Sequence, residues 1–219
     1  MENGGDEKVS SDAFLARAQY CRLAYDVIQD YNLAFDIGSN LGGFSFAHHD
    51  RFKKIVCVEA MPETFNECEK NIGYLSNVTI INRAVSKESG EEISIYKHSN
   101  GDSGSSSCVN NKITSLDLKE PVSVKTISYE KLVEEHGVPD YMKVDIEGSE
   151  YDFLMNKDLS GVKFLSLELH VGFLSGSQRK SLMKHLMNFF TIYKHRKAAA
   201  GKRHDEFSLI NWKLHTDDY

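Results

Sequence analysis

The sequence is poor in several features that define other classes of protein. Its 219 residues include three prolines, one tryptophan and four cysteines, and the cysteines form neither a C-x-x-C pair nor a disulfide framework. We therefore expect buried thiols in a reducing, cytoplasmic compartment. No apolar run is long enough to span a membrane, and the N-terminus lacks the pattern of a signal peptide. Basic residues are not in excess: the net charge of −6 argues against nucleic acid as a general partner.

The remaining composition is that of an ordinary globular protein. Hydrophobic residues make up 41% of the chain and charged residues 26%. This length is most simply one domain, residues 1–219, with a core that needs no cross-links. Residues 1–31 are expected to form a polar tail and a helix that Ser11 or Asp12 caps and that runs to about Asp30. The sequence indicates no oligomeric state.

A glycine-rich turn follows the first apolar strand, Leu33–Ile37, and leads into a helix. Such a turn presents backbone N–H groups to a ligand, which is either a dinucleotide or S-adenosylmethionine. Dinucleotide sites favour G-x-G-x-x-G, but here Asn40 replaces the second glycine, which disfavours a dehydrogenase. The pattern D-x-G-x-N-x-G suits a donor whose ammonium needs a carboxylate. It predicts a donor site containing Asp36, Gly38, Asn40 and Gly42.

The ends of the next two strands predict the rest of the donor site. The strand Lys54–Val58 leads to Glu59, Ala60 and Met61. A carboxylate accepts two hydrogen bonds at once, so Glu59 suits the two ribose hydroxyls of an adenosine. Met61 is placed to lie against the adenine. After a third strand, residues 78–82, the main chain around Ala84 is expected to contact the adenine edge.

Further elements follow from periodicity and from turn signals. We expect additional strands at 91–97 and 122–127, helices at 63–74, 128–137 and 178–190, and a closing hairpin of 191–195 with 207–214. The serine- and glycine-rich segment 98–120 lies inside the domain and is predicted to be a lid over the donor or the acceptor.

A cluster of acids follows another short strand. Asp145 ends the strand that begins near Asp140, and Gly148 permits a tight turn into a helix. Ligands of open α/β sheets bind beyond the C-terminal ends of the strands. The next strand, Phe164–His170, carries Glu168 and His170 two positions apart, so both side chains point to the same face.

Together these stretches resemble the FkbM family of S-adenosylmethionine-dependent methyltransferases. The matching segments are FDIGSNLGGFS, CVEAMPETFNECEKN, NRAVSKESG, GSSS and DYMKVDIEGSEYDFL followed by LSLELH. The resemblance implies an α/β, Rossmann-like class I methyltransferase fold. Its sheet is seven-stranded and mostly parallel, with an antiparallel last strand and helices on both faces. It also implies O-methylation of a hydroxyl on a sugar or a polyketide-type small molecule, with S-adenosylhomocysteine as the product. Asp145, Glu147 and Glu150 match the acidic site motif of the family. We expect Asp145 to contact the donor as well, and Ser106, Ser107, Glu147 and Glu150 to bind the substrate.

Methyl transfer to a hydroxyl requires that its proton be removed, and two mechanisms remain open. In the first, Asp145 or His170 is a general base. In the second, Asp145, Glu168 and His170 hold a divalent ion, Mg²⁺ or Mn²⁺, that lowers the pKa of the acceptor hydroxyl. The acid-rich site predicts a sugar or glycan acceptor. A polyketide-type or other small molecule is the alternative, and 2′-O-methylation of nucleic acid is less favoured because Glu168 stands near the position where such enzymes use a lysine.

Overall fold

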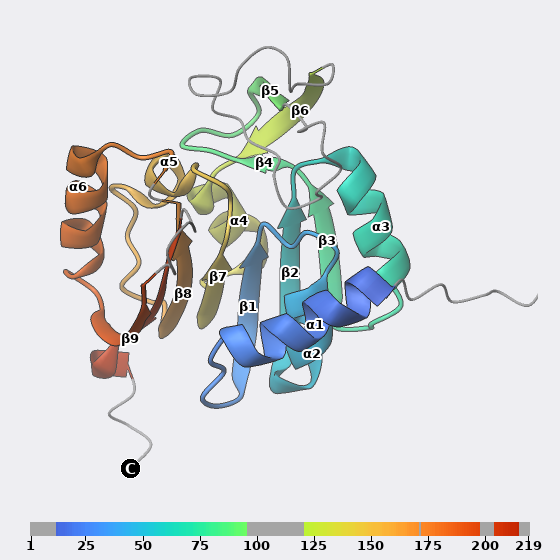
Figure 1. Ribbon diagram of the computed structural model, residues 1–219, viewed down its shortest axis with the longest axis horizontal. Coiled ribbons are helices and arrows are strands. Elements are labelled where there is room, and N and C mark those ends of the chain that lie inside the picture. The colour runs from blue at the N-terminus through green and yellow to red at the C-terminus, as the bar shows by residue number, and fades with distance from the viewer. Residues whose placement is uncertain (1–11, 96–120, 171, 198–203, 215–219) are drawn as a thin grey trace, which may run out of the picture.

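The computed structural model describes residues 12–95, 121–170, 172–197 and 204–214 (Figure 1). The predicted lid, with Ser106 and Ser107, lies outside these residues, and so does Ser11. Within them, no helix is both long and apolar enough to cross a membrane. Cys21, Cys57 and Cys68 are buried, unpaired thiols.

A seven-stranded sheet forms the centre of the described chain. In spatial order its strands are β3 (Val78–Asn82), β2 (Phe52–Glu59), β1 (Tyr31–Ile37), β7 (Tyr141–Val144), β8 (Phe164–Leu169), β10 (Asp205–Ile210) and β9 (Thr191–Arg196). Neighbours from β3 to β8 pair in parallel, whereas β10 runs antiparallel to both β8 and β9. The last strand is therefore the one antiparallel strand of this sheet, and the predicted fold class is confirmed.

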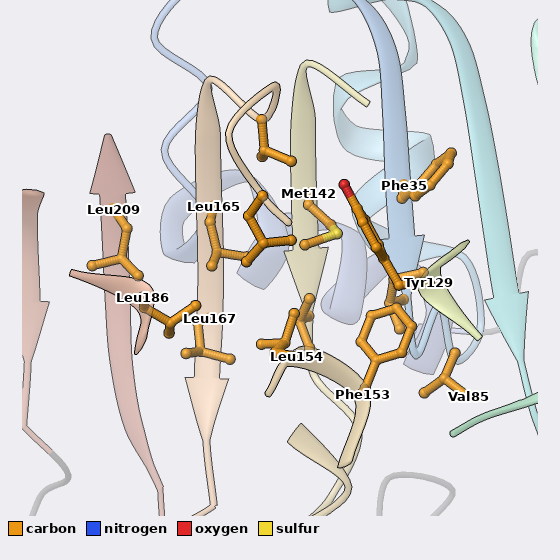
Figure 2. Close-up of a cluster of buried hydrophobic side chains, with 14 of the residues drawn as sticks. Phe35, Val85, Tyr129, Met142, Phe153, Leu154, Leu165, Leu167, Leu186 and Leu209 are labelled. Carbon is orange, nitrogen blue, oxygen red and sulfur yellow. The ribbon is translucent and has the colours of Figure 1, made fainter. Parts of the chain in front are cut away.

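Helices cover both faces of the sheet, as the alternation of side chains along β1 requires. Leu33, Phe35 and Ile37 point into the larger apolar cluster, whereas Ala34 points into the other. Figure 2 shows part of the larger cluster, in which Phe153, Leu154 and Leu186 pack on side chains of the strands. The face of this cluster carries α4 (Tyr129–His136), α5 (Glu150–Leu154) and α6 (Gly176–Leu186). The opposite face carries α1 (Asp12–Ala24), α2 (Gly43–His48) and α3 (Pro62–Ile72).

Local capping explains several helix ends. Ser128 caps α4 by accepting a hydrogen bond from the Lys131 N–H, and Gly137, with φ of 93°, follows its last turn. The predicted first helix is six residues too long, since α1 ends at Ala24. Beyond it, the Asp26 carboxylate accepts hydrogen bonds from Lys194 on β9 and Ser208 on β10. These contacts hold the segment after α1 against the two strands, and the helix does not continue.

A small second sheet lies beyond the C-terminal ends of β2 and β3 (Figure 1). Its strand order is β4 (Ala84–Val85), β6 (Val122–Ile127) and β5 (Glu92–Ile95). The predicted strand at 91–97 is confirmed for residues 92–95, outside the main sheet. Ala84, Ile95 and Val124 of this sheet form a small apolar cluster with Met61. This cluster supports one side of the cavity described next.

Candidate active site

The glycine turn after β1 packs directly on the end of β7. Gly38 has φ of 75°, and a Cβ atom there would lie 1.8 Å from the Asp145 carbonyl oxygen. Its N–H donates to the Val58 carbonyl, and the Asp145 N–H donates to the Ile37 carbonyl. Only glycine fits this position without moving a strand, because both the backbone conformation and the space exclude a side chain. The turn thereby brings the ends of β1, β2 and β7 together.

Glu59 joins the turn to the end of β2. One carboxylate oxygen accepts from the Asn40 N–H and the other from the Met61 N–H, both at 2.9 Å. Burial raises the pKa of Glu59, although these two hydrogen bonds oppose that shift. Asn40 itself has φ of 51°, an uncommon conformation for a residue with a side chain. The carboxylate is thus held in one orientation at the rim of the turn.

A cavity open to solvent lies at these strand ends, and the empty space in it, open solvent included, is about 660 Å³. It is lined by seven residues that the sequence predicted for the site, namely Gly38, Asn40, Glu59, Ala60, Ala84, Asp145 and Glu147. Val58, Val85, Ile95 and Ile146 add apolar walls. A mostly apolar pocket with a few fixed polar groups is the usual form of a small-molecule site. The carboxylates of Glu59, Asp145 and Glu147 stand among these apolar residues and make the cavity amphipathic.

Asp36, predicted to contact the donor, does not line this cavity. Its carboxylate is fully buried on the α1–α3 face of the sheet, where Ser45 Oγ donates to it at 2.7 Å. Lys143 Nζ lies 3.4 Å from Asp36 Oδ1 and donates to the Gly38 carbonyl at 2.6 Å. Asp36 is therefore linked to the turn through Lys143.

Two further predicted donor residues also point away from the cavity. Gly42, with φ of 86°, packs against α3, where a Cβ atom would lie 2.7 Å from the Ile72 side chain. The Met61 side chain is 1% exposed within the small apolar cluster. Gly42 therefore permits close packing between the turn and α3, and Met61 supports the wall behind Ala84.

Four carboxylates surround the imidazole of His170. Glu150 Oε1 lies 2.6 Å from Nδ1, whereas three acids face Nε2: Glu147 at 3.2 Å, Glu168 at 3.7 Å and Asp145 at 3.9 Å. We call these four acids together with His170 the acid cluster. The predicted convergence of the β7 and β8 ends is present. Glu150, predicted to bind substrate, is fully buried and holds His170 and the Gly148 N–H.

The electrostatics of the acid cluster bear on the choice of a base. Burial alone lowers the pKa of His170, but the hydrogen bond with Glu150 and the nearby carboxylates outweigh it and raise the pKa to about 9. Burial raises the pKa of both Glu147 and Glu168 to about 7. Burial also favours the neutral form of Asp145, yet Lys143, His170 and Arg17 outweigh it and lower its pKa. The carboxylates thus favour the protonated form of His170, and Lys143, His170 and Arg17 favour the ionised form of Asp145, which makes Asp145 a weak base.

Glu147 is held in an unusual backbone conformation at the cavity. Its φ is 48°, and the following Gly148 has φ of 105°. A Cβ atom on Gly148 would lie 2.6 Å from Phe173, so the turn is tight against its neighbour. Strained residues of this kind gather at functional sites, where the surroundings hold them in place. The turn directs the half-buried Glu147 into the cavity.

Sequence reasoning missed several residues of this region. Arg17 on α1 lines the cavity, with its guanidinium 3.4 Å from Asp145 Oδ2. Tyr25 Oη lies 3.4 Å from both Asp145 Oδ2 and Glu168 Oε2. His204, which precedes β10, has its Nδ1 3.1 Å from Glu168 Oε1. These residues are distant in sequence from the motifs, and only the tertiary packing of α1 and β10 brings them in.

Lys143 was visible in the sequence, beside the Asp145 motif, but it was assigned no role. It is 3% exposed, between Asp36 and Asp145. Burial lowers its pKa, but the two carboxylates outweigh this and raise it. The alternation of side chains on β7 placed Lys143 and Asp145 on one face, and this is the signal that could have identified it.

The sheet topology, the glycine turn and the cavity at the strand ends define a Rossmann-like methyltransferase fold. A comparison with protein families matches residues 36–203 to the methyltransferase FkbM domain. This match covers more than half of the chain, which therefore belongs to the FkbM family of S-adenosylmethionine-dependent methyltransferases. The resemblance seen in the sequence is confirmed.

Solved structures with related folds share little sequence with this chain. An FkbM methyltransferase from Methylobacillus flagellatus KT is 14% identical, with a TM-score of 0.45 over 82% of this chain and 43% of that one. M. capricolum TrmK, in complex with S-adenosyl-homocysteine, is 10% identical, with a TM-score of 0.47 over 92% and 68%. An NADB-Rossmann superfamily protein from Streptococcus agalactiae is 15% identical, with a TM-score of 0.49 over 89% and 67%. A comparison with curated protein sequences found no match.

Proposed function

We propose that this chain is an O-methyltransferase that moves the methyl group of S-adenosylmethionine to a hydroxyl of a sugar or glycan. The observation that carries the proposal is the position of Asp145, which lines the donor cavity and also belongs to the acid cluster. A methyl group held at this end of the cavity lies next to the groups that would bind a hydroxyl-rich acceptor. Donor and acceptor thus meet at one residue.

Each part of the donor has a complementary group on the cavity wall. The Glu59 carboxylate suits the ribose hydroxyls, and Val85, Ile95 and Ile146 offer apolar contact to adenine beside the Ala84 backbone. At the other end, Asp145 is placed for the donor ammonium, and Arg17 for its carboxylate. Arg83 also lines the cavity, but its guanidinium donates to the Asn82 carbonyl next to Ala84, at the adenine end.

The transfer is an in-line displacement. A lone pair of the acceptor oxygen forms the new bond to the methyl carbon, the carbon–sulfur bond breaks, and its electron pair stays on sulfur to give neutral S-adenosylhomocysteine. The hydroxyl proton leaves as the bond forms, and the acid cluster is placed to take it up. Holding oxygen, carbon and sulfur on one line is itself a large part of such catalysis. Asp36 and Lys143 contribute indirectly, because they hold the glycine turn in place.

The acid cluster favours a polyol over a flat apolar acceptor. Carboxylates accept hydrogen bonds from paired hydroxyls, and Glu147 is the most exposed member of the cluster, with 32% of its side chain accessible. A polyketide-type small molecule with vicinal hydroxyls would meet the same groups and is the second candidate. A nucleic-acid acceptor is less favoured, because its phosphates would approach a chain with net charge −6.

Calorimetric titration with two ligands tests the donor site. S-Adenosylhomocysteine carries the amino-acid moiety, whereas 5′-methylthioadenosine lacks it. Wild type should bind both, and Arg17→Ala should lose about 10- to 100-fold in affinity for S-adenosylhomocysteine alone, as expected for a charge-assisted hydrogen bond. Arg22→Ala is the matched control, since Arg22 lies on the same helix but donates to the Ala47 carbonyl.

Two outcomes of this titration would contradict the proposal in different ways. If wild type fails to bind S-adenosylhomocysteine, or binds NAD as well, the donor assignment is wrong. If Arg17→Ala weakens binding of both ligands equally, the donor carboxylate lies elsewhere.

A second experiment identifies the acceptor, by transfer of a labelled methyl group to deoxysugar glycans, free sugars, polyketide-type alcohols and RNA. Labelling of RNA alone would refute the sugar assignment.

A further inference from the structure

Five side chains from three segments, the turn after β7, the end of β8 and the start of β10, bring a nitrogen or an oxygen close to the His170 imidazole or to its neighbour Glu168, beside the donor cavity. His170 Nε2 lies 3.2 Å from Glu147 Oε2, 3.7 Å from Glu168 Oε1 and 3.9 Å from Asp145 Oδ1. His204 Nδ1 approaches from the start of β10 and lies 3.1 Å from Glu168 Oε1. Asp145, Glu168 and His170 are at most 9% exposed, so these groups meet largely away from solvent.

The spacings match those between the ligands of a single metal ion. Ligand atoms about 2.0–2.2 Å from an ion lie roughly 3 Å apart when adjacent and about 4.4 Å apart when opposite. The four distances above fall within this interval. Two triads that share His170, one with Glu168 and His204 and the other with Asp145 and Glu147, each have all ligand atoms within 4.8 Å of one another.

Outer contacts hold three of these side chains by the atom that points away from the centre. Glu150 Oε1 contacts His170 Nδ1 at 2.6 Å, which directs Nε2 inward. Tyr25 Oη contacts Asp145 Oδ2 and Glu168 Oε2, and so Oδ1 and Oε1 face His170. Metal-binding histidines and carboxylates are commonly oriented in this way by a second set of hydrogen bonds.

We propose that Asp145, Glu147, Glu168, His170 and His204 bind one divalent transition-metal ion. Three of these residues were predicted as ligands from the sequence, and Glu147 and His204 are added by the structure. Two imidazoles among the ligands favour Mn²⁺, Fe²⁺ or Zn²⁺ over Mg²⁺ and Ca²⁺, which prefer oxygen alone.

The role of this ion rests on the proposed function. Bound at the end of the donor cavity, it would lower the pKa of an acceptor hydroxyl that coordinates to it. Tyr25 contacts the outer oxygens of Asp145 and Glu168, so Glu147, the most exposed of the three acids, would receive the proton. The ion would also offset the mutual repulsion of the three acids. Binding of the ion itself is measured without donor or acceptor.

The test is a titration of the full chain with Mn²⁺ after removal of metals by EDTA and gel filtration, with the EPR signal of free Mn²⁺ as readout. Wild type should show one saturable site. His204→Gln and Glu168→Gln should each weaken it at least about 10-fold. His195→Gln is the matched control, because His195 Nε2 lies 3.7 Å from Asp205 Oδ2, a comparable histidine–carboxylate pair on β9 and β10 outside the cluster.

The Mn²⁺ titration can either support or overturn the proposed metal site. Absence of a saturable site in wild type, or binding by both variants equal to that of wild type and His195→Gln, overturns the proposal. Circular dichroism checks that the variants fold. Should neither fold, pulsed EPR of Mn²⁺-loaded wild type decides: nitrogen couplings from histidine support the site, and their absence refutes it. Binding of Mn²⁺ without binding of S-adenosylhomocysteine would refute the donor assignment and leave the metal site standing.

Discussion

Lys143 and Asp36 are partners in register on the neighbouring strands β7 and β1, with Lys143 Nζ 3.4 Å from Asp36 Oδ1. The same ammonium lies 3.7 Å from Asp145 Oδ2 and donates to the Gly38 carbonyl. One buried cation thus compensates two buried carboxylates and holds the glycine turn. Lys143 thereby supports two residues that line the cavity, Gly38 and Asp145.

Replacement of Lys143 by methionine should destabilise the protein strongly. Removing one partner of a buried ion pair leaves an uncompensated charge, which costs about 3–5 kcal/mol. Urea unfolding measures the loss. Lys163→Met is the control, because Lys163 is 31% exposed beside Asp140 and such a pair contributes about 0–1 kcal/mol. Adding Asp36→Asn to Lys143→Met should restore part of the stability; equal losses in Lys143→Met and the control would contradict the pairing.

Gly38→Ala and Gly90→Ala form a matched pair. Both glycines have φ near 80°, at 75° and 84°, but a Cβ atom on Gly38 meets the Asp145 carbonyl, whereas one on Gly90 meets nothing within 4 Å. Gly90→Ala should cost only about 1–2 kcal/mol for its backbone conformation. Gly38→Ala should cost more than about 3 kcal/mol and abolish binding of S-adenosylhomocysteine. Thermal unfolding and calorimetry check both, and similar losses of stability would refute the contact.

Glu59→Gln should weaken binding of S-adenosylhomocysteine by about 10-fold or more, since an amide has one acceptor oxygen where the carboxylate has two. Its NH₂ group would face the Asn40 N–H or the Met61 N–H, both of which need an acceptor. Calorimetry measures the affinity. Glu69→Gln, at an exposed position on α3, is the control. Unchanged affinity in Glu59→Gln would show that the ribose lies elsewhere.

The contribution of His48 to stability should be lost as the pH drops below about 6.5, whereas the raised pKa values of Glu147 and Glu168 act in the opposite direction. Burial lowers the pKa of His48, and the hydrogen bond with the Cys21 carbonyl opposes this shift. The charged neighbours of His48 are Arg22, Asp50 and Arg51. Below the unfolded pKa of about 6.5, the unfolded chain binds the proton first, so the contribution is present at higher pH and is lost on acidification toward the folded pKa. His48→Gln should flatten this part of the profile, measured by urea unfolding from pH 7.5 to 5; an unchanged slope would contradict it.

Periodicity and turn chemistry predicted most of the main sheet, because those signals are local. The strand at residues 78–82, the two turns at Gly38 and Gly148, and the closing hairpin follow from short patterns. The antiparallel last strand was instead implied by the family resemblance. The pairing of strands in the small sheet is a feature that local sequence signals do not predict. Its parallel pairing of Ala84 with Thr126 joins residues more than 40 positions apart, and no pattern in either segment specifies that partner.

The sequence predicted which strand ends form the site, but not which side chains contact one another there. Glu59 and Asp145 line the cavity because they end strands at the edge where ligands bind. Asp36 lies one residue before such an end, and its side chain points into the face of the sheet that α1–α3 cover. Arg17 could not be found, since the residues of α1 do not indicate which strand ends the helix will cover.

The family match begins at residue 36 and ends at residue 203. Arg17 and Tyr25 precede it, and His204 follows it directly, yet all three contact residues of the acid cluster. The segment that the family match covers and the set of residues that build the acid cluster and its surroundings therefore have different boundaries. A fragment trimmed to the matched residues would keep the glycine turn and lose part of the wall around it. Conversely, exchanging the first helix between relatives offers a way to alter ligand preference while the central sheet stays intact.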